Sequence, residues 1–187
     1  MVHEVRWCFT CTDQPYEYPY EYDLRAVSSQ HGRRTGQSFA EIQGGPLAPN
    51  LHGYVVFTDV PYGTEVFVEV SGLPAFQPAA GNQPQIGPFG FHLHEHGVCT
   101  VGNSEDPFTA AGSHWNPTQQ PHGNHVGDFP VLFSNDGYAR MTFFTNKISA
   151  ADVVGRTLII HQSPDDFHSQ PAGNSGKRLA CGVIYAG

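Results

Sequence analysis

The sequence predicts an all-β domain, built as an antiparallel sandwich or barrel with two long loops, and three observations support this prediction. Short strand signals recur from about residue 38 to the end of the chain, with turn residues between them. Turn formers are abundant, with 21 Gly and 15 Pro among 187 residues. Only the segment KISAADVVGR indicates a helical turn, and it is too short to change the class. Short strands at this spacing are typical of β-sandwiches and β-barrels.

Eight segments carry the strand signal. It is clearest in TEVFVEVSGL, where three valines fall on one face and two glutamates and Phe67 fall on the other. The tripeptide Asn135-Asp136-Gly137 between two of the segments is typical of a hairpin turn. In chain order, the predicted strands are residues 38–44, 51–60, 64–73, 90–96, 127–134, 138–146, 157–162 and 179–187.

The domain organisation is predicted from composition. Residues 1–37 are expected to form an N-terminal extension, because they hold the Pro-broken stretch TDQPYEYPYEYD and the linker-like SSQHGRRTGQS. Residues 38–187 are expected to form the β domain. Two stretches within it, 98–124 and 163–177, do not follow the strand rhythm. Loops of this length in a compact domain tend to be functional or disordered, and both are flanked by histidines.

Charge and hydropathy exclude several classes of partner. Nine basic and seventeen acidic residues give a net charge of −8, so nucleic acid and anionic membrane surfaces are poor partners. No apolar run approaches the roughly 18 residues of a membrane span. The N-terminal MVHEVRWCFTCTDQ lacks the basic and apolar segments of a secretory signal. Localisation therefore stays open between an intracellular protein and the mature form of an exported one.

Histidines are numerous and grouped. The chain has eleven of them, and the stretch HWNPTQQPHGNHVGD holds three together with an aspartate. His92 and His94 alternate in a predicted strand, so their imidazoles project from one face. His161 ends a later strand. A lone histidine is usually structural or solvated, but imidazoles and a carboxylate grouped around two long loops predict a site for copper or zinc.

Four segments, in this order, closely resemble the Cu,Zn superoxide dismutases: GFHLHEHG, GSHWNPTQQPHGNHVGDFP, VVGRTLIIHQSPDDF and GNSGKRLACGVI. The resemblance covers about residues 38–187. The loop DDFHSQPAGNSGKR is similar to bacterial members, and Ala172 stands where many members have Thr. The family implies an eight-stranded antiparallel Greek-key β-barrel. It also implies an antioxidant oxidoreductase that converts superoxide to dioxygen and hydrogen peroxide by Cu(II)/Cu(I) cycling, with copper and zinc ions as cofactors.

The resemblance implies two sets of metal ligands that share one residue. His114 is expected to touch both ions and to supply a proton to the reduced substrate, which makes it a catalytic residue. The expected copper ligands are His92, His94, His114 and His161, and the expected zinc ligands are His114, His122, His125 and Asp128.

Further residues also match the family pattern. Asp165 matches the carboxylate that joins a copper-ligand histidine to a zinc-ligand histidine, here His92 and His122, and so fixes their tautomers. Arg178 matches the guanidinium beside the copper that attracts the substrate anion, and Lys177 is expected to add to the positive field there. The resemblance also pairs Cys99 with Cys181 in an intrasubunit disulfide.

Some readings stay open. A non-catalytic copper carrier and a dismutase-like domain without copper are the rival functions, although such relatives commonly lose a copper ligand or the arginine, and this chain keeps all of them. Cys8 and Cys11 form a CxxC, and one reading is free thiols or a local disulfide. The other reading is a role in acquiring copper or in clipping a metal together with His3. His96 and His168 are expected at the surface. A homodimer and a monomer are both compatible with the family.

Overall fold

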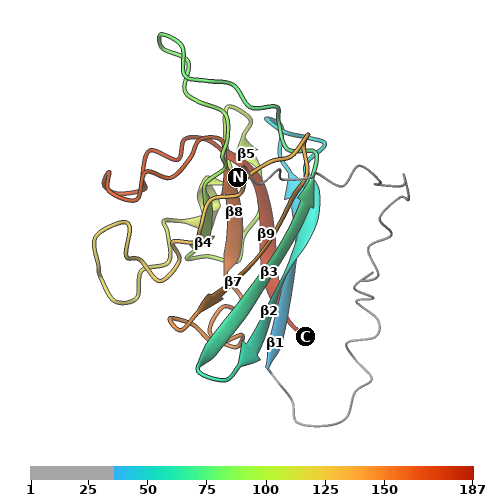
Figure 1. The fold of residues 1–187 in the computed structure, drawn as a ribbon, viewed down its shortest axis with the longest axis vertical. Coiled ribbons are helices and arrows are strands. Elements are labelled where there is room, and N and C mark those ends of the chain that lie inside the picture. Colours follow the sequence, from blue (N-terminus) through green and yellow to red (C-terminus); the bar gives the residue numbers. More distant parts are fainter. Residues whose placement is uncertain (1–35) are drawn as a thin grey trace, which may run out of the picture. The chain divides into compact units, whose positions relative to one another are not determined.

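The computed structural model describes residues 36–187, which form an all-β domain around one antiparallel sheet (Figure 1). Seven strands follow one another in the order β4-β8-β9-β1-β2-β3-β7, and the sheet curls into a half-barrel. Its strands are β1 (Gln37–Gly44), β2 (His52–Val60), β3 (Gly63–Ser71), β4 (Phe91–His94), β7 (Ala139–Thr145), β8 (Thr157–His161) and β9 (Arg178–Ala186). A separate hairpin pairs β5 (Gly102–Asn103) with β6 (Asp106–Pro107).

The central strands follow the alternation in their sequence. The three valines of β3 are buried, whereas Glu65 on the opposite face is exposed. Phe67 also lies on the outer face, where it packs at 5.7 Å from the ring of Tyr54 and beneath the guanidinium of Arg140. The predicted all-β class is confirmed.

The interior of the half-barrel is a single apolar cluster to which all seven strands contribute. Phe129 belongs to this cluster, and its ring centroid lies 5.6 Å from that of Phe91, 6.4 Å from that of Phe57 and 5.1 Å from that of Phe143. Burying an aromatic side chain of this kind contributes roughly 2–3 kcal/mol. Because Phe129 follows the loop of histidines directly, its burial fixes the end of that loop against the core.

One predicted strand does not form. Residues 127–134 make only isolated bridges with the β4 region, among them Phe89 with Leu132. Pro130 lies in the middle of this segment and has no N–H to donate to a ladder, which is a physical reason for the interruption. The main sheet therefore has seven strands, and the segment expected to form a further strand lies beside β4 as isolated bridges.

The predicted turns have mixed outcomes. Asn135 and Tyr138 exchange two backbone hydrogen bonds (2.7 and 3.0 Å), and Asp136 and Gly137 between them have φ of 50° and 86°. This confirms the hairpin turn, since positive φ at both central residues defines its type. The helical turn expected in residues 147–156 is a series of hydrogen-bonded turns instead. The only helical segment within residues 36–187 is a 3-10 turn over Thr109–Ala111.

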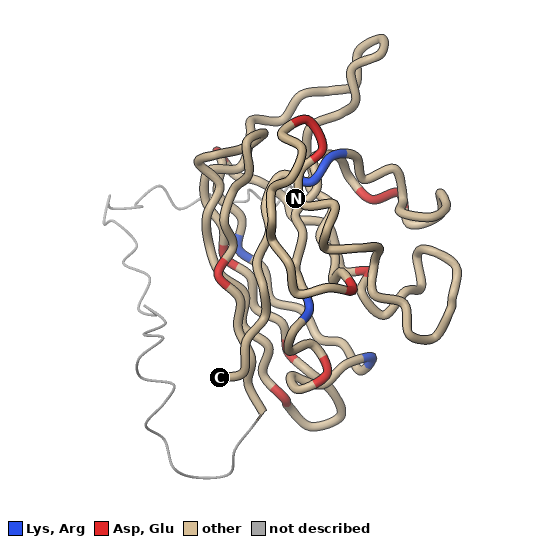
Figure 2. Tube along the Cα trace, turned by 180° about the vertical axis from the view of Figure 1, so that it is seen from behind, with Lys and Arg blue, Asp and Glu red and all other residues tan. Residues whose placement is uncertain are grey.

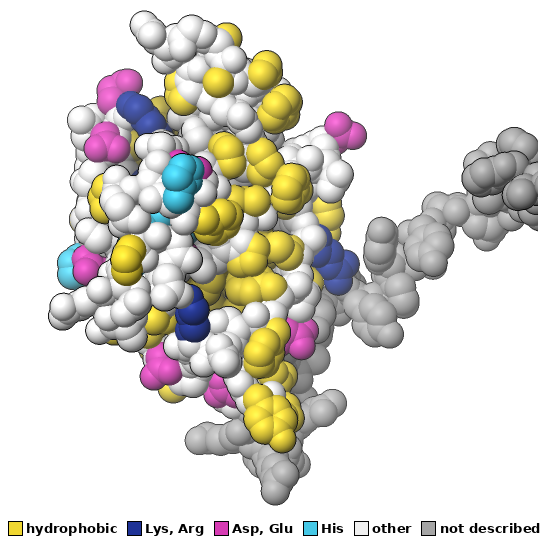
Figure 3. Space-filling model, turned by 60° about the vertical axis from the view of Figure 1, so that its left-hand side comes forward, with side chains coloured by type: hydrophobic (Ala, Val, Ile, Leu, Met, Phe, Trp, Pro, Cys, Tyr) yellow, Lys and Arg dark blue, Asp and Glu magenta, His cyan; other side chains and the backbone are white. Residues whose placement is uncertain are grey.

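Residues 36–187 include no helix that is long and apolar enough to cross a bilayer. Figure 3 shows a face on which hydrophobic side chains form a broad band, with charged and histidine side chains beside it. Strand β1 begins at Gln37, and residues 1–35 lie outside the described residues. The division between an extension and a β domain at residues 37 and 38 stays a prediction, as does any role of Cys8 and Cys11.

Candidate metal centre

The first four histidines of the centre come from two strands and one irregular loop. His92 and His94 lie two residues apart on β4, so both rings project to the same side. His161 is the last residue of β8, which pairs with β4. His114 reaches the same edge through an isolated bridge with His94. Neighbouring strands and a loop thus bring four buried imidazoles to one place.

The ligand atoms form two groups that share His114. Within each group, the nitrogen or oxygen atoms all lie within 4.8 Å of one another. The first group is His92, His94, His114 and His161, and the second is His114, His122, His125 and Asp128. Imidazole suits copper and zinc, and a carboxylate beside imidazoles suits zinc. The donor sets therefore fit the two ions that the sequence predicts.

The Nε2 atoms of His94 and His161 lie 3.3 Å apart and face each other. His94 donates its Nδ1–H to the carbonyl of Gly112 (3.0 Å), and His161 donates its Nδ1–H to that of Gly176 (3.2 Å). A neutral imidazole has a single N–H, so both Nε2 atoms present lone pairs. Two acceptors at this distance repel each other unless a cation lies between them. This pair therefore fits a metal ion.

Asp165 fixes the tautomer of one histidine from each group. Its Oδ2 accepts from Nε2 of His92 (2.7 Å), and its Oδ1 accepts from Nε2 of His122 (2.8 Å), with all three side chains fully buried. The Nδ1 atoms of both histidines are left with lone pairs and without hydrogen-bond partners in the described part of the chain. Because an unsatisfied buried polar atom costs about 1–3 kcal/mol, these atoms also fit metal ligands.

Asp128 gathers three imidazoles around its carboxylate. The Nδ1 atoms of His114, His122 and His125 lie 3.0, 3.3 and 3.3 Å from its oxygens. Oδ2 also accepts the backbone N–H groups of Gly123 and His125 at 2.9 Å each. Burial acts to raise the pKa of Asp128. The hydrogen bonds from His114 and from the backbone of His125 outweigh it and hold the pKa below its usual value. Asp128 is therefore a carboxylate at neutral pH.

Burial keeps several histidines of the centre neutral. It lowers the pKa of His161 to about 3, with the neighbouring His114 acting in the same direction. Burial likewise lowers the pKa of His92 and of His94 well below the usual value, and His161 adds to both shifts. Neutral imidazole is the form that binds metals, so protons do not compete with a metal here at neutral pH.

A cavity of about 330 Å³ opens onto the first group, and Arg178 is the cation in its wall. The guanidinium is half-buried and donates to the carbonyls of Phe108 (2.6 Å) and Gly112 (2.7 Å). The complete lining consists of His94, Ser113, His114, His161, Gln170, Pro171, Ala172, Asn174, Ser175, Gly176 and Arg178. The cavity thus joins three ligand histidines, one fixed positive charge and several neutral side chains.

Lys177 is not among the residues that line this cavity. Its ammonium group donates to the carbonyl of Glu105, and its side chain lines a different hollow. Figure 2 shows how sparse basic residues are on the described chain compared with acidic ones. Arg178 is therefore the one basic residue that lines the cavity, and the expectation that Lys177 adds to the positive field at its mouth stays a prediction.

Comparison with known proteins agrees with this geometry. The family model for copper/zinc superoxide dismutase (SODC) matches residues 51–184. The chain belongs to the copper/zinc superoxide dismutase family. A Cu-Zn superoxide dismutase of Deinococcus radiodurans is 38% identical over 151 residues, covering 72% of this chain and 77% of the relative. A Cu-Zn superoxide dismutase of Legionella pneumophila is 34% identical over 145 residues, covering 73% and 79%.

Solved structures of the family share the fold of this dismutase domain. The Cu/Zn superoxide dismutase from Brucella abortus superposes with a TM-score of 0.63 at 28% identity, covering 79% of this chain and 98% of that one. A double mutant of a SOD-like protein from Bacillus subtilis gives a TM-score of 0.61 at 26% identity, covering 79% and 96%. The expected resemblance to bacterial members is confirmed.

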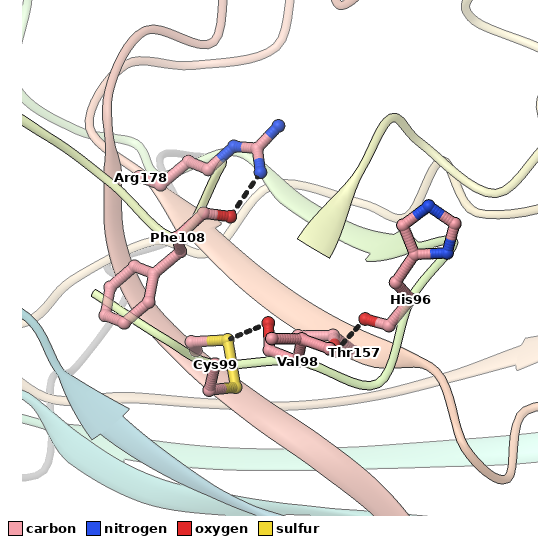
Figure 4. Close-up of a disulfide and its surroundings, with 7 residues drawn as sticks. His96, Val98, Cys99, Phe108, Thr157 and Arg178 are labelled. Atoms are coloured by element: carbon pink, nitrogen blue, oxygen red, sulfur yellow. Dashed lines mark hydrogen bonds between the residues drawn. A yellow bond between two sulfur atoms is a disulfide. The ribbon is translucent and has the colours of Figure 1, made fainter. Parts of the chain in front are cut away.

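The dismutase domain holds the predicted disulfide. Cys99 and Cys181 are bonded, with their Cα atoms 5.6 Å apart. The bond ties the loop after β4 to β9, and Figure 4 shows it close to the hydrogen bond from Arg178 to Phe108. A small buried cluster of Phe108, Ala111, Ile159 and Cys181 fills the space beneath this loop. The disulfide therefore supports the loop whose carbonyls hold the guanidinium.

Two residues of the dismutase centre were missed by sequence reasoning. Gln170 brackets the backbone of His122, accepting its N–H at 2.9 Å and donating to its carbonyl at 3.2 Å. Gly173 has φ of 62°, and a Cβ there would overlap the Asp165 carboxylate and lie 2.5 Å from Nε2 of His122. The first glycine of GNSGKR is Gly173, and a glycine in a loop flanked by ligand residues is a signal that could have pointed to it. No local pattern marks Gln170.

The remaining histidines of the dismutase domain lie at the surface, as the sequence predicts. His96 is exposed, two residues beyond the end of β4. The side chain of His168 is 80% exposed and lies 3.0 Å from Asp166. Neither residue belongs to the two ligand groups.

Proposed function

We propose that this chain is a superoxide dismutase in which the two ligand groups hold copper and zinc. Copper is held by His92, His94, His114 and His161, and zinc is held by His114, His122, His125 and Asp128. The facing lone pairs of His94 and His161 are the observation that carries the copper assignment, since a metal ion accounts for them and a hydrogen bond does not. Copper when bound supplies one-electron exchange with superoxide, while redox-silent zinc holds and polarises its ligands.

His114 is the residue proposed to move a proton. Its Nδ1 lies 3.0 Å from Asp128, whereas its buried Nε2 has no hydrogen-bond partner among the described residues. His114 also lines the cavity from which substrate would approach. When Nδ1 does not carry the proton, His114 can carry it at Nε2 and donate it as a general acid to a reduced oxygen species in the cavity.

Arg178 is proposed to attract and orient the superoxide anion. Its two hydrogen bonds to backbone carbonyls hold the guanidinium in the cavity wall and leave its other N–H groups to a ligand. A planar fork of donors suits a diatomic anion better than a single ammonium does. A fixed local charge also attracts an anion to a chain whose net charge is −8.

Metal analysis and a superoxide-scavenging assay test this function together. The full chain loaded with copper and zinc is expected to bind one of each and to accelerate superoxide decay, whereas the chelated protein is expected to be inactive. Loaded protein that holds copper without scavenging superoxide would point to the copper-carrier reading. Protein that takes up no copper would refute the enzyme assignment.

The oligomeric state needs a separate measurement. Sedimentation velocity would distinguish the proposed homodimer from a 20.4 kDa monomer.

A further inference from the structure

Three residues of the metal centre form a closed ring of backbone hydrogen bonds. Trp115 N–H donates to Leu93 O (2.8 Å), Leu93 N–H donates to Gly127 O (2.9 Å), and Gly127 N–H donates to Trp115 O (3.0 Å). Each residue therefore gives one hydrogen bond and accepts one. Leu93 lies on β4, whereas Trp115 and Gly127 lie near the two ends of one loop, so the ring forms only when this loop packs on the strand.

Every member of the ring adjoins ligand residues. Leu93 lies between His92 and His94 on β4, and Trp115 directly follows His114. Gly127 precedes Asp128 and lies two residues after His125. The ring thus joins the backbone of β4, which carries copper ligands, to the residue shared by both metals and to the segment that carries zinc ligands.

Only glycine fits at position 127. A Cβ there would lie 2.5 Å from Leu93 O, 3.1 Å from Leu93 Cβ and 3.2 Å from Trp115 N. The closest contact would be with the backbone oxygen of Leu93, which accepts the hydrogen bond from Trp115 within the ring. Because this atom belongs to the backbone, it cannot move aside as the end of a flexible side chain could. Any larger residue must push the zinc-ligand segment away from β4.

The second ring member is also held firmly. The guanidinium of Arg156 lies 3.8 Å above the Trp115 ring, and it donates to the carbonyls of Asp152 (3.1 Å) and Glu95 (3.4 Å). A guanidinium over an aromatic face is attracted to the negative face of the ring, so this contact restrains the Trp115 side chain. Trp115 is therefore fixed from both its backbone and its side chain, and it cannot readily shift to accommodate a displaced residue 127.

We propose that the Leu93–Trp115–Gly127 ring sets the spacing of the copper and zinc ligand segments before any metal binds, and that Gly127 is a positioning residue for both ions. The identity of the ions rests on the proposed function. The ring itself does not, because it contains only backbone atoms. Preorganised ligands bind more tightly since the cost of ordering them is met in folding.

Amide hydrogen exchange of the metal-free full chain tests the ring without reference to any metal. The N–H groups of Leu93, Trp115 and Gly127 are expected to exchange as slowly as that of Val68 in the central strand β3, because each is hydrogen-bonded in a folded core. Exchange of these amides at the rate of Thr118, an exposed loop residue, would overturn the proposal.

Gly127→Ala tests the positioning role, with Gly53→Ala as the matched control. A Cβ at Gly53 would also strike a backbone oxygen, that of Glu69, but on β2 and away from the ligands. Zinc affinity is measured by chelator competition, and the copper environment by electron paramagnetic resonance. Gly127→Ala is expected to weaken zinc binding at least about tenfold and to alter the copper spectrum. Gly53→Ala is expected to lower thermal stability while leaving both metal readouts unchanged.

The outcomes separate the two proposals. Unchanged zinc affinity and an unchanged copper spectrum in a folded Gly127→Ala chain would refute the positioning role. If the unaltered chain binds neither ion, the proposed function fails, and the exchange rates still decide whether the ring orders these segments. Should Gly127→Ala fail to fold, the exchange experiment on the unaltered chain remains decisive.

Discussion

Arg178 and His94 donate to the same acceptor, the carbonyl oxygen of Gly112, at 2.7 and 3.0 Å. One carbonyl thus sets both the tautomer of a proposed copper ligand and the position of the guanidinium in the cavity wall. A displacement of Gly112 would disturb the two together. The cation that we propose to attract substrate and the proposed copper ligand are therefore coupled through one backbone group.

Arg178→Gln is expected to lower the rate constant for superoxide decay by about ten- to a hundredfold, because the cavity wall loses its fixed charge. The decline of the rate with rising ionic strength should also become shallower. Pulse radiolysis at several salt concentrations measures both quantities. Lys177→Gln removes the same charge one residue earlier, but Lys177 does not line the cavity, and we expect less than a twofold change from it. Equal effects of the two variants would contradict the assignment.

His161→Gln is expected to remove copper while leaving zinc bound, since His161 belongs to the first ligand group and not to the second. The rate constant for superoxide decay should fall at least about a hundredfold. This is more than we expect from losing a residue that only hydrogen-bonds to a metal ligand. Metal content by mass spectrometry, together with activity, gives the readout. His168→Gln in the exposed loop is the control and should retain both. Retained activity in His161→Gln would disprove the copper assignment.

Asp165→Asn is expected to weaken metal binding by about ten- to a hundredfold. The amide NH₂ would face the N–H of either His92 or His122, and that imidazole would have to shift its proton to Nδ1, its metal-binding atom. Chelator competition for zinc and copper measures the loss. Asp136→Asn, an exposed turn residue, makes the same chemical change and should leave both affinities unaltered. A tight-binding Asp165→Asn chain would show that the carboxylate bridge is dispensable.

The metal-free protein is expected to lose stability as the pH falls from about 6.5 towards 3. Burial lowers the pKa of His161 to about 3 in the folded chain, whereas an unfolded histidine titrates near about 6.5. Between these values the unfolded chain binds more protons, so acid favours unfolding. At pH 5, His161 alone accounts for about 2 kcal/mol relative to pH 7.5. Urea unfolding at the two pH values measures this loss, and it should be smaller in His161→Gln. Stability that rises on acidification would contradict the argument.

Much of the fold followed from local patterns in the chain. Alternation in TEVFVEVSGL predicted the buried valines of β3, and alternation in the segment around His92 and His94 predicted that both imidazoles share one side. The strand expected at residues 127–134 failed because alternation says nothing about whether a neighbour can pair. Pro130 cannot donate to a ladder, and only isolated bridges form.

The resemblance to the family predicted which residues gather at the candidate centre, and the structure brings them together. It did not predict which atoms face one another, because that depends on backbone contacts made by the folded loops. Gln170 illustrates this, because its two hydrogen bonds to His122 join residues 48 positions apart. The ring through Leu93, Trp115 and Gly127 is of the same kind. Such contacts are set by how the loops pack on the half-barrel, which no local sequence pattern records.

The facing Nε2 atoms of His94 and His161 also have a consequence for the energy landscape of the chain. The backbone carbonyls that orient the two imidazoles leave them in mutual repulsion, so the apo fold is locally frustrated at its own centre. A cation converts that conflict into attraction. Metal binding therefore adds stability to a chain whose ligand segments are already spaced, and the supply of copper and zinc shifts its folding equilibrium by mass action.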